Sequence, residues 1–279
     1  MKTARELPAL SDLVAGARDA GRTIGFVPTM GALHEGHVSL ARLARRETGF
    51  VVVSIFVNPL QFGPGEDFTR YPRREDDDRA KLSGSDVDLV YLPAPGEFYP
   101  AGFSTAVEVG GVSENGEGAA RPGHFRGVAT VVAKLFHQVA PDVAVFGRKD
   151  LQQVAVVRRM IRDLDFPIRL VVGDTVREPD GLAMSSRNAY LSSEERRLAS
   201  EFPRALFEGR DAAARGERDA GKLSADVRNR LAAAGIRVDY VDVVDPETME
   251  PIAHAFPGSA IAAAVRIGST RLIDNVLLP

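Results

Sequence analysis

The chain has 279 residues, no cysteine and a formal net charge of −3, and 44% of its residues are hydrophobic. This length suits one large domain or two unequal ones, and the charge argues against a protein that wraps nucleic acid. The absence of cysteine excludes disulfides, iron–sulfur clusters and thiolate zinc sites. The longest apolar run, FVVVSIFV, is far shorter than the roughly 20 residues of a membrane-spanning helix. We therefore expect a soluble cytoplasmic protein that binds neither nucleic acid nor a membrane.

Residues 22–57 predict a strand, a helix and a second strand. The apolar run TIGFVPT has the length of a strand and ends at Pro28 and Gly31. Between Leu33 and Arg46 the apolar residues recur on one helical face. The run FVVVSIFVN then has the β-branched and aromatic character of a strand that is buried on both faces. We expect a right-handed βαβ unit here.

The alternation of strands and helices continues to about residue 175. The stretches REDDDRAKLSGS, GVATVVAKLFHQVA and LQQVAVVRRMIRDL predict helices, and VDLVYLP, DVAVF and IRLVVG predict strands. Strands that alternate with helices form a parallel sheet covered on both faces. The predicted fold class is therefore α/β, with a Rossmann-like sheet whose ligands bind beyond the carboxyl ends of the strands.

The composition changes after residue 175. Residues 194–235 are rich in alanine and charge and predict two or three surface helices, and VDYVDVVD, AIAAAVRIG and TRLIDNVLL predict strands. We divide the chain into a Rossmann-like domain, residues 1–175, and a smaller α+β C-terminal domain, residues 176–279, that closes over the site. The glycine-rich stretch GGVSENGEGAARPG is expected to be a long loop.

Two of the five histidines, His34 and His37, stand at the start of the first predicted helix. Such a pair can bind a metal, act as a base, contact phosphate, or merely cap the helix and pack. The sequence HEGH lacks the HExxH spacing of zinc proteases. Nearby glycines allow a close backbone approach and a helix N-terminus attracts anions, so phosphate contacts are favoured over a cation.

Further polar groups follow other predicted strands. Each has a plain structural alternative, such as a helix cap or a solvated surface, and the acidic run in particular is typical of a solvated helix face. Neither a P-loop nor a GxGxxG after a strand occurs. Together the groups predict a nucleotide- or phosphate-binding α/β enzyme; they are Asn58, Gln61, the acidic run Asp76–Asp78, Lys149, Asp150, Gln153, Ser185, Ser186 and Arg187.

Six motifs in order resemble those of the pantoate–β-alanine ligase family, within the HxGH nucleotidyltransferase superfamily. They lie between residues 26 and 188 and read FVPTMGALHEGH, VNPLQF, YPR, RPGHFRGV, FGRKDLQQ and DGLAMSSRN. The resemblance implies that pantoate is condensed with β-alanine to pantothenate through a pantoyl adenylate, with release of AMP and pyrophosphate. It also implies ATP as substrate, Mg²⁺ as cofactor and a homodimer.

The resemblance assigns roles residue by residue. The implied catalytic residues are His34, His37, Lys149 and Arg187. The implied ATP-binding residues are Met30, His34, His37, Gly147, Lys149, Asp150, Val176, Met184, Ser185, Ser186 and Arg187. The implied substrate-binding residues are Pro28, Met30, Asn58, Gln61, Phe62 and Gln153. Asp77 and Asp78 are the implied protein groups near Mg²⁺.

The chain departs from the family pattern at Arg148, where an acidic residue is usual, and at Asn115 and Gly116, where more apolar residues are usual. These positions bear on loop closure and affinity rather than on the reaction. Three alternatives stay open on the residues alone. They are another nucleotidyltransferase of the same superfamily, a nucleotide sensor without catalysis, and a histidine metallohydrolase.

Overall fold

Six parallel strands form one sheet in the computed structural model, which describes residues 1–279. Their spatial order is β1-β4-β3-β2-β5-β6, and every neighbouring pair is parallel. The strands are β1 (Lys2–Ala4), β2 (Ile24–Thr29), β3 (Phe50–Ile55), β4 (Leu89–Tyr91), β5 (Val143–Gly147) and β6 (Arg169–Gly173). The predicted α/β class with a parallel sheet is confirmed. Of the six strands, only β1 was not predicted.

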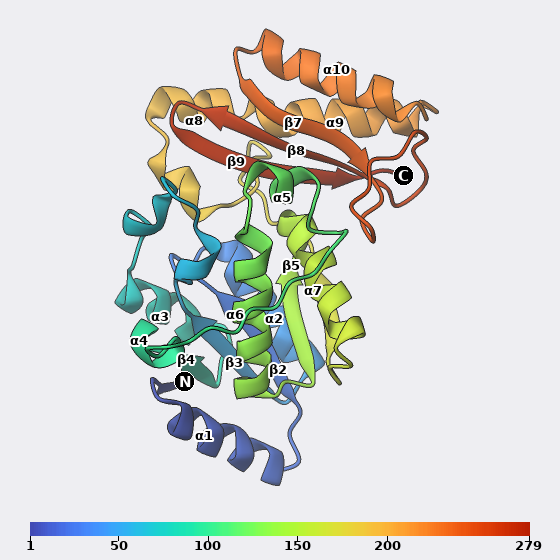
Figure 1. Cartoon of the computed structure of the whole chain (residues 1–279). Helices are drawn as coiled ribbons and strands as arrows, with labels where there is room; N and C mark the ends of the chain where they lie inside the picture. Colours follow the sequence, from blue (N-terminus) through green and yellow to red (C-terminus); the bar gives the residue numbers. More distant parts are fainter. The chain divides into compact units, whose positions relative to one another are not determined.

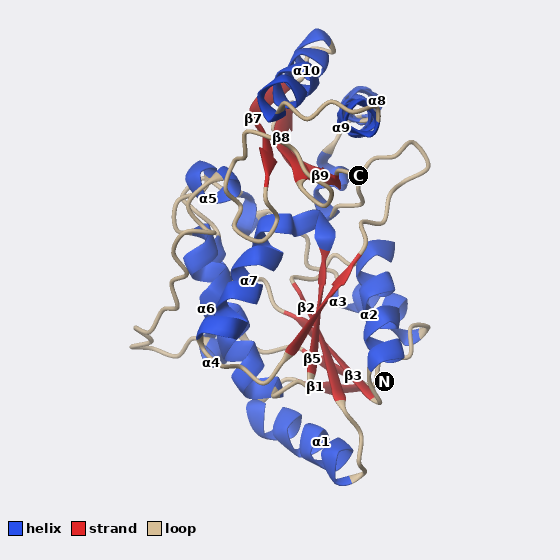
Figure 2. Ribbon diagram, turned by 90° about the vertical axis from the view of Figure 1, so that its right-hand side faces the viewer, coloured by secondary structure: helices blue, strands red, loops and turns tan.

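Helices cover both faces of this sheet, as predicted. Figure 2 shows α2 on one face and α6 on the other, and α3 packs beside α2 while α1 packs beside α6. The apolar stripe of α2 closes a core against the inner strands, with Leu33, Ala41 and Val53 almost fully buried. The helices are α1 (Leu7–Asp19), α2 (Glu35–Glu47), α3 (Glu75–Ser83), α4 (Pro95–Phe98), α6 (His124–Val139) and α7 (Leu151–Asp163).

The direction of winding reverses at β2. From β2 the chain passes through α2 to β3 on one side, whereas β5 pairs with β2 on the other side, with Gly25 opposite Val143. The carboxyl ends of β2 and β5 therefore flank the switch point, which is where sheets of this kind bind their ligands. His34 follows β2 after a short loop, and Gly147 is the last residue of β5.

The chain separates into two units. Unit 1 holds the parallel sheet and comprises Met1–Val109, Pro122–Arg148 and Val156–Asp174. Unit 2 comprises Thr175–Pro279 together with two short segments from earlier in the chain, Gly110–Arg121 and Lys149–Ala155.

Unit 2 contains an antiparallel three-stranded sheet in the order β7-β8-β9, which confirms the smaller α+β part. Helices α9 and α10 pack on this sheet and on each other around Phe202, Val227 and Ile261. The short helix α5, which was predicted to be loop, also packs on the sheet (Figure 1). The elements are α5 (Gly116–Ala120), α8 (Ser193–Ala199), α9 (Glu201–Ala214), α10 (Ala220–Ala233), β7 (Arg237–Val244), β8 (Ala260–Ile267) and β9 (Thr270–Leu277).

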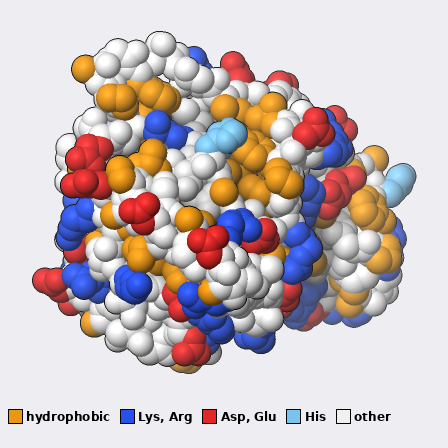
Figure 3. All heavy atoms as spheres, turned by 90° about the horizontal axis from the view of Figure 1, so that it is seen from below, with side chains coloured by type: hydrophobic (Ala, Val, Ile, Leu, Met, Phe, Trp, Pro, Cys, Tyr) orange, Lys and Arg blue, Asp and Glu red, His pale blue; other side chains and the backbone are white.

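No helix has the length and apolar character that crossing a membrane requires. On the face seen in Figure 3, acidic and basic side chains are intermixed and no broad patch of one sign is present.

Gly127 in α6 allows the turn after β3 to lie directly against that helix. A Cβ atom at this position would lie 2.1 Å from the Leu60 carbonyl oxygen and 2.6 Å from the Gln61 nitrogen. Because these are backbone atoms, they cannot rotate away. We expect Gly127→Ala to lower the free energy of unfolding by roughly 1–3 kcal/mol, as overpacking does.

Urea denaturation measures this change. Gly16→Ala is the matched control, because Gly16 also lies in a helix and a Cβ there meets no atom within 4 Å. The control should keep or slightly raise stability, since alanine is the better helix former by about 0.5–1 kcal/mol. Equal stability of the Gly127→Ala variant and the wild type would contradict the close approach.

Candidate active site

The two histidines at the start of α2 are fixed by backbone hydrogen bonds. His34 is the N-cap residue, and its Nδ1 accepts the Gly36 N–H at 3.2 Å. His37 Nδ1 accepts the His34 N–H at 3.3 Å, and the two ring centroids lie 4.1 Å apart. Because both Nδ1 atoms accept, a neutral ring carries its proton on Nε2. Each neutral ring therefore has its N–H donor at Nε2, and the pair stands at a helix N-terminus, a place that suits anionic oxygens.

The loop before His34 is held by α3. Asp78 accepts hydrogen bonds from the backbone N–H groups of Ala32 at 2.9 Å and Leu33 at 2.6 Å. Its side chain is almost completely buried, with the residue 1% exposed. Burial raises the pKa of the Asp78 carboxyl, and the two backbone hydrogen bonds oppose that shift. The acidic run is therefore solvated at Asp76 and Asp77, as the structural alternative expects, but not at Asp78.

The buried side chain of Asn58 holds the turn after β3 through hydrogen bonds. Its Nδ2 donates to Gln61 Oε1 at 3.0 Å and to the Gly127 carbonyl at 3.1 Å. Its Oδ1 accepts from Tyr99 Oη at 2.9 Å and from Leu60 N at 3.2 Å. With two donors and two acceptor positions, an amide side chain is satisfied by these four bonds. Asn58 is 1% exposed, and its side chain orients Gln61. The expected contact between Asn58 and the substrate stays a prediction.

Gln61 lies between Asn58 and the β2 loop. Its Nε2 donates to Met30 Sδ at 3.0 Å, so Gln61 and Met30 are brought together as predicted substrate-binding neighbours. His124 holds the same turn through a 2.8 Å contact between its Nδ1 and the Gln61 carbonyl oxygen. Pro28 and Phe62 are half-buried, and Phe62 packs against Phe68 with ring centroids 5.3 Å apart. One residue of the motif RPGHFRGV, His124, thus contacts the turn that carries Gln61.

In unit 2, Lys149 is fixed through its backbone. Asn275 in β9 donates from Nδ2 to the Lys149 carbonyl oxygen at 2.9 Å. The Lys149 ammonium lies 3.4 Å from the Asp150 carboxylate. Lys149 follows the end of β5 by two residues, and Gln153 comes one helical turn further on and is half-buried. The cation and the carboxylate are both accessible for a ligand of mixed polarity.

The motif GLAMSSRN forms a tight ribbon and a 3₁₀ turn, η4 (Ser186–Tyr190). The Met184 N–H donates to the Val176 carbonyl at 3.0 Å, so the two residues predicted beside adenine are neighbours. Ser185 caps η4 by accepting the Arg187 N–H at 3.3 Å. Since η4 packs on β9, the strand that also binds Lys149, the predicted hydroxyls and cations of unit 2 gather around β9.

The base of this ribbon is a buried ion pair. Arg177 donates to Asp274 Oδ2 at 2.7 Å and Oδ1 at 3.0 Å, and also to the carbonyls of Gly181 and Asn275. The Asp274 side chain is 1% exposed. Burial raises the pKa of Asp274, and the Arg177 guanidinium opposes the shift.

The residues assigned to Mg²⁺ do not form a protein chelate. No group of three or more His, Asp or Glu side chains is placed to hold a metal ion. Both oxygens of Asp78 accept backbone hydrogen bonds, while Asp77 is exposed. Magnesium prefers near-octahedral oxygen ligation and is often bound through one or two carboxylates plus substrate phosphates. Asp78 does not fit direct ligation of Mg²⁺. The expected place of Asp77 near the ion stays a prediction.

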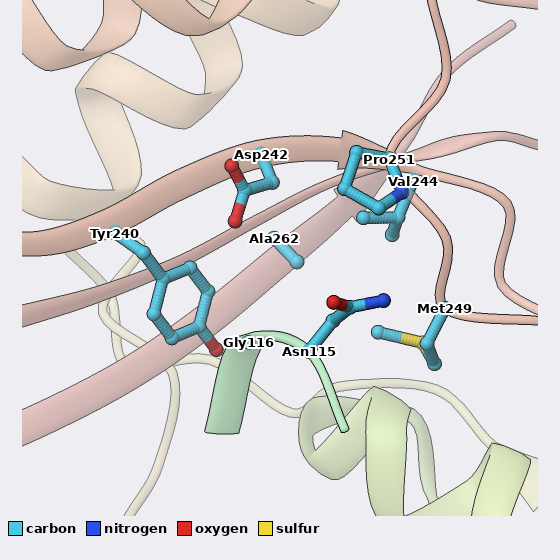
Figure 4. Close-up of a pocket in the computed structure, with 8 residues that line it drawn as sticks. All are labelled: Asn115, Gly116, Tyr240, Asp242, Val244, Met249, Pro251 and Ala262. Carbon is cyan, nitrogen blue, oxygen red and sulfur yellow. The ribbon is translucent and has the colours of Figure 1, made fainter. Parts of the chain in front are cut away.

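The departures from the family pattern at Asn115 and Gly116 line a small pocket within unit 2. Figure 4 shows Tyr240 and Asp242 of β7 facing the start of α5 across it. The pocket has room for about one water molecule, so it is no nucleotide site. Gly116 has a φ of +50, which glycine adopts without strain. Arg148, the third departure, pairs with Asp174 at 3.1 Å within unit 1.

Three residues that position the site were not among the predicted site residues. Gln152 is buried next to the predicted Gln153. Its side chain holds the segment before α5 through Val112 and Asn115, and the first turn of α5 through Glu117. Asn275 and Asp274 interrupt the apolar pattern of a predicted strand. Two adjacent buried polar residues in a strand are the kind of signal that indicates a required partner.

The chain has a parallel sheet, and hydrogen-bond donors suited to an anion follow the strand at which the strand order reverses. This combination defines a nucleotide-binding α/β enzyme. The model of the pantoate-beta-alanine ligase family matches residues 2–277 of the chain. The chain belongs to the pantoate–β-alanine ligase family. It is 51% identical over 279 residues to the pantothenate synthetase of Moorella thermoacetica, covering 100% of this chain and 99% of that one.

Two solved structures are similar in fold and sequence. Pantothenate synthetase from Thermus thermophilus has a TM-score of 0.94 at 49% identity, with 100% of both chains covered. Pantoate-beta-alanine ligase from Francisella tularensis, complexed with beta-gamma ATP and beta-alanine, has a TM-score of 0.83 at 33% identity. That match covers 99% of this chain and 97% of the other.

Proposed function

We propose that this chain condenses pantoate with β-alanine to pantothenate at the expense of ATP, through a pantoyl adenylate. Family membership over nearly the whole chain supports the overall reaction. The observation that carries the mechanism is that Nδ1 of both His34 and His37 accepts a backbone hydrogen bond at the start of α2, so that Nε2 carries the proton of each neutral ring. Donors held rigidly where charge develops are the main means by which such transfers are accelerated.

In the first half-reaction, a pantoate carboxylate oxygen attacks the α-phosphorus of ATP. The bond from that phosphorus to the oxygen bridging to the β-phosphate breaks, and pyrophosphate leaves. His34 and His37 donate to phosphate oxygens as negative charge builds on them, and the Lys149 and Arg187 cations do the same. Gln61 and Gln153 bind pantoate, whose methyl groups meet Pro28, Met30 and Phe62.

The remaining ATP contacts follow the family pattern. Gly147 and Asp150 hold the ribose, Val176 and Met184 lie against adenine, and Ser185 and Ser186 bind phosphate. In the second half-reaction the amine of β-alanine attacks the activated acyl carbon, AMP leaves, and the amine proton passes to water. Mg²⁺ dependence with Asp77 near the ion, a homodimer and a cytoplasmic location complete the proposal and rest on the resemblance alone.

ATP–pyrophosphate isotope exchange tests the first half-reaction. With Mg²⁺ and pantoate present and β-alanine omitted, we expect exchange that stops when pantoate is left out. Addition of β-alanine should then release AMP, which a nucleotidyltransferase that ends at a nucleotidylated product would not do. Absence of exchange in folded protein that binds ATP would contradict the proposal and favour a sensor.

A further inference from the structure

The loop between β2 and α2 adopts a backbone that alanine does not favour. Gly31 has a φ of +82 and Ala32 a φ of +50. The left-handed region costs a residue with a Cβ roughly 1–2 kcal/mol, so Ala32 needs an external hold. The same loop sets the position of His34, two residues later, and hence the donor geometry of both rings.

The hold comes from two side chains one turn apart on α3. Asp78 accepts the N–H groups of Ala32 and Leu33 at 2.9 and 2.6 Å, and Lys81 Nζ donates to the Leu33 carbonyl at 2.7 Å. Three hydrogen bonds thus fix two successive residues. We call Asp78 and Lys81 the α3 clamp.

The clamp is connected to the histidines by further bonds. Leu33 is 2% exposed and anchors the loop in the core. The next residue is His34, whose N–H donates to His37 Nδ1 at 3.3 Å. A displacement of Leu33 therefore moves the His34 ring. It also alters the hydrogen bond from the His34 N–H to His37 Nδ1, which sets the tautomer of His37.

We propose that Asp78, assisted by Lys81, is a positioning residue that sets the geometry of His34 and His37, and that it is not a Mg²⁺ ligand. The kinetic part of this inference rests on the proposed function. Three features favour it over ligation: both carboxylate oxygens accept backbone bonds, the residue is buried, and the Lys81 ammonium donates to the carbonyl of Leu33, whose N–H Asp78 accepts. An ammonium group repels Mg²⁺.

Asp78→Asn tests the inference because it keeps the shape but turns one acceptor into a donor that faces a backbone N–H. We expect kcat of pantoate-dependent exchange to fall about ten- to a hundredfold, as a misplacement near 1 Å can cause. The concentration of Mg²⁺ that gives half-maximal rate should stay within about twofold of the wild-type value, since the clamp holds no metal.

Two further variants complete the kinetic test. Lys81→Met, on the exposed side of the clamp, should lower kcat in the same direction by a smaller factor, again with an unchanged Mg²⁺ requirement. Asp76→Asn removes a neighbouring exposed carboxylate and should leave both quantities unchanged. Loss of kcat that high Mg²⁺ restores in Asp78→Asn would overturn the inference, and so would an unchanged kcat.

Imidazole ¹⁵N NMR gives a reading that does not depend on the reaction. The chain has five histidines, so the ring signals are few enough to assign. Asp78→Asn should shift the signals of His34 and His37 and leave those of His137 and His254 in place. Unchanged signals for the pair would overturn the clamp. Shifted signals in a protein that shows no exchange would instead keep the clamp and refute the proposed function.

Discussion

Replacing His37 by alanine is expected to lower the rate of pantoate-dependent ATP–pyrophosphate exchange by about 10²–10³-fold, the usual effect of removing one transition-state donor. The variant loses the Nε2–H donor and also the Nδ1 acceptor of the His34 N–H, so His34 is less well fixed. Pantoate affinity should change far less, because Gln61 is oriented by Asn58 and His124.

Exchange kinetics and titration calorimetry with pantoate separate the two effects. His254→Ala is the control, because it removes an exposed histidine from unit 2 and should leave exchange unchanged. A His37→Ala variant that forms the adenylate at the wild-type rate would remove the histidine pair from the mechanism.

Replacing Arg177 by methionine is expected to lower the free energy of unfolding by roughly 3–5 kcal/mol, because it leaves a buried charge without its partner. Asp274 is almost fully enclosed, and Arg177 is its charged partner as well as a donor to two backbone carbonyls. Arg177 also packs over the Phe207 ring at 5.0 Å. The ribbon that carries Val176 and Met184 should loosen in parallel, with weaker ATP binding.

Urea denaturation followed by circular dichroism measures the loss. Arg204→Met is the matched control: its partner Glu201 lies 2.6 Å away, but the arginine side chain is 57% exposed. Exposed pairs contribute only about 0–1 kcal/mol. The double variant Arg177→Met with Asp274→Leu should recover much of the loss, since an apolar pair can replace a buried ion pair. A loss below about 1 kcal/mol in the single variant would show that Asp274 finds another partner.

The parallel sheet was predictable because its strands and helices carry strong local patterns. β3, with five of its six residues buried, reads directly as an inner strand. β1 has only three residues and was missed, because its identity as a strand comes from pairing with β4 far along the chain. α5 was expected as loop for the same reason: Glu117 is fixed by Arg271, 154 residues away, and no local signal carries that contact.

The candidate site, too, was predictable from the sequence only in part. Motif positions identified His34, His37 and Lys149, since glycine spacing and strand ends are visible in the sequence. The sequence did not reveal that Asp78 is buried while Asp77 is exposed, because this difference depends on which carboxylate meets the loop before α2. Asn58 was expected to meet a ligand, yet its side chain is occupied by partners that include Tyr99 and Gly127, far along the chain.

The interleaving of the chain limits how this fold can be recombined in evolution. The segments Gly110–Arg121 and Lys149–Ala155 belong to unit 2 although unit 1 surrounds them in the sequence. Their side chains and backbone are tied to the C-terminal strand β9, Glu117 to Arg271 and Lys149 to Asn275. A gene fusion that exchanged only the last hundred or so codons would therefore leave the buried Glu117 carboxylate without Arg271. It would also remove the hydrogen bond from Asn275 that fixes Lys149. The C-terminal part can be inherited or replaced only together with two short inserts in the first part, so it does not behave as a transferable module.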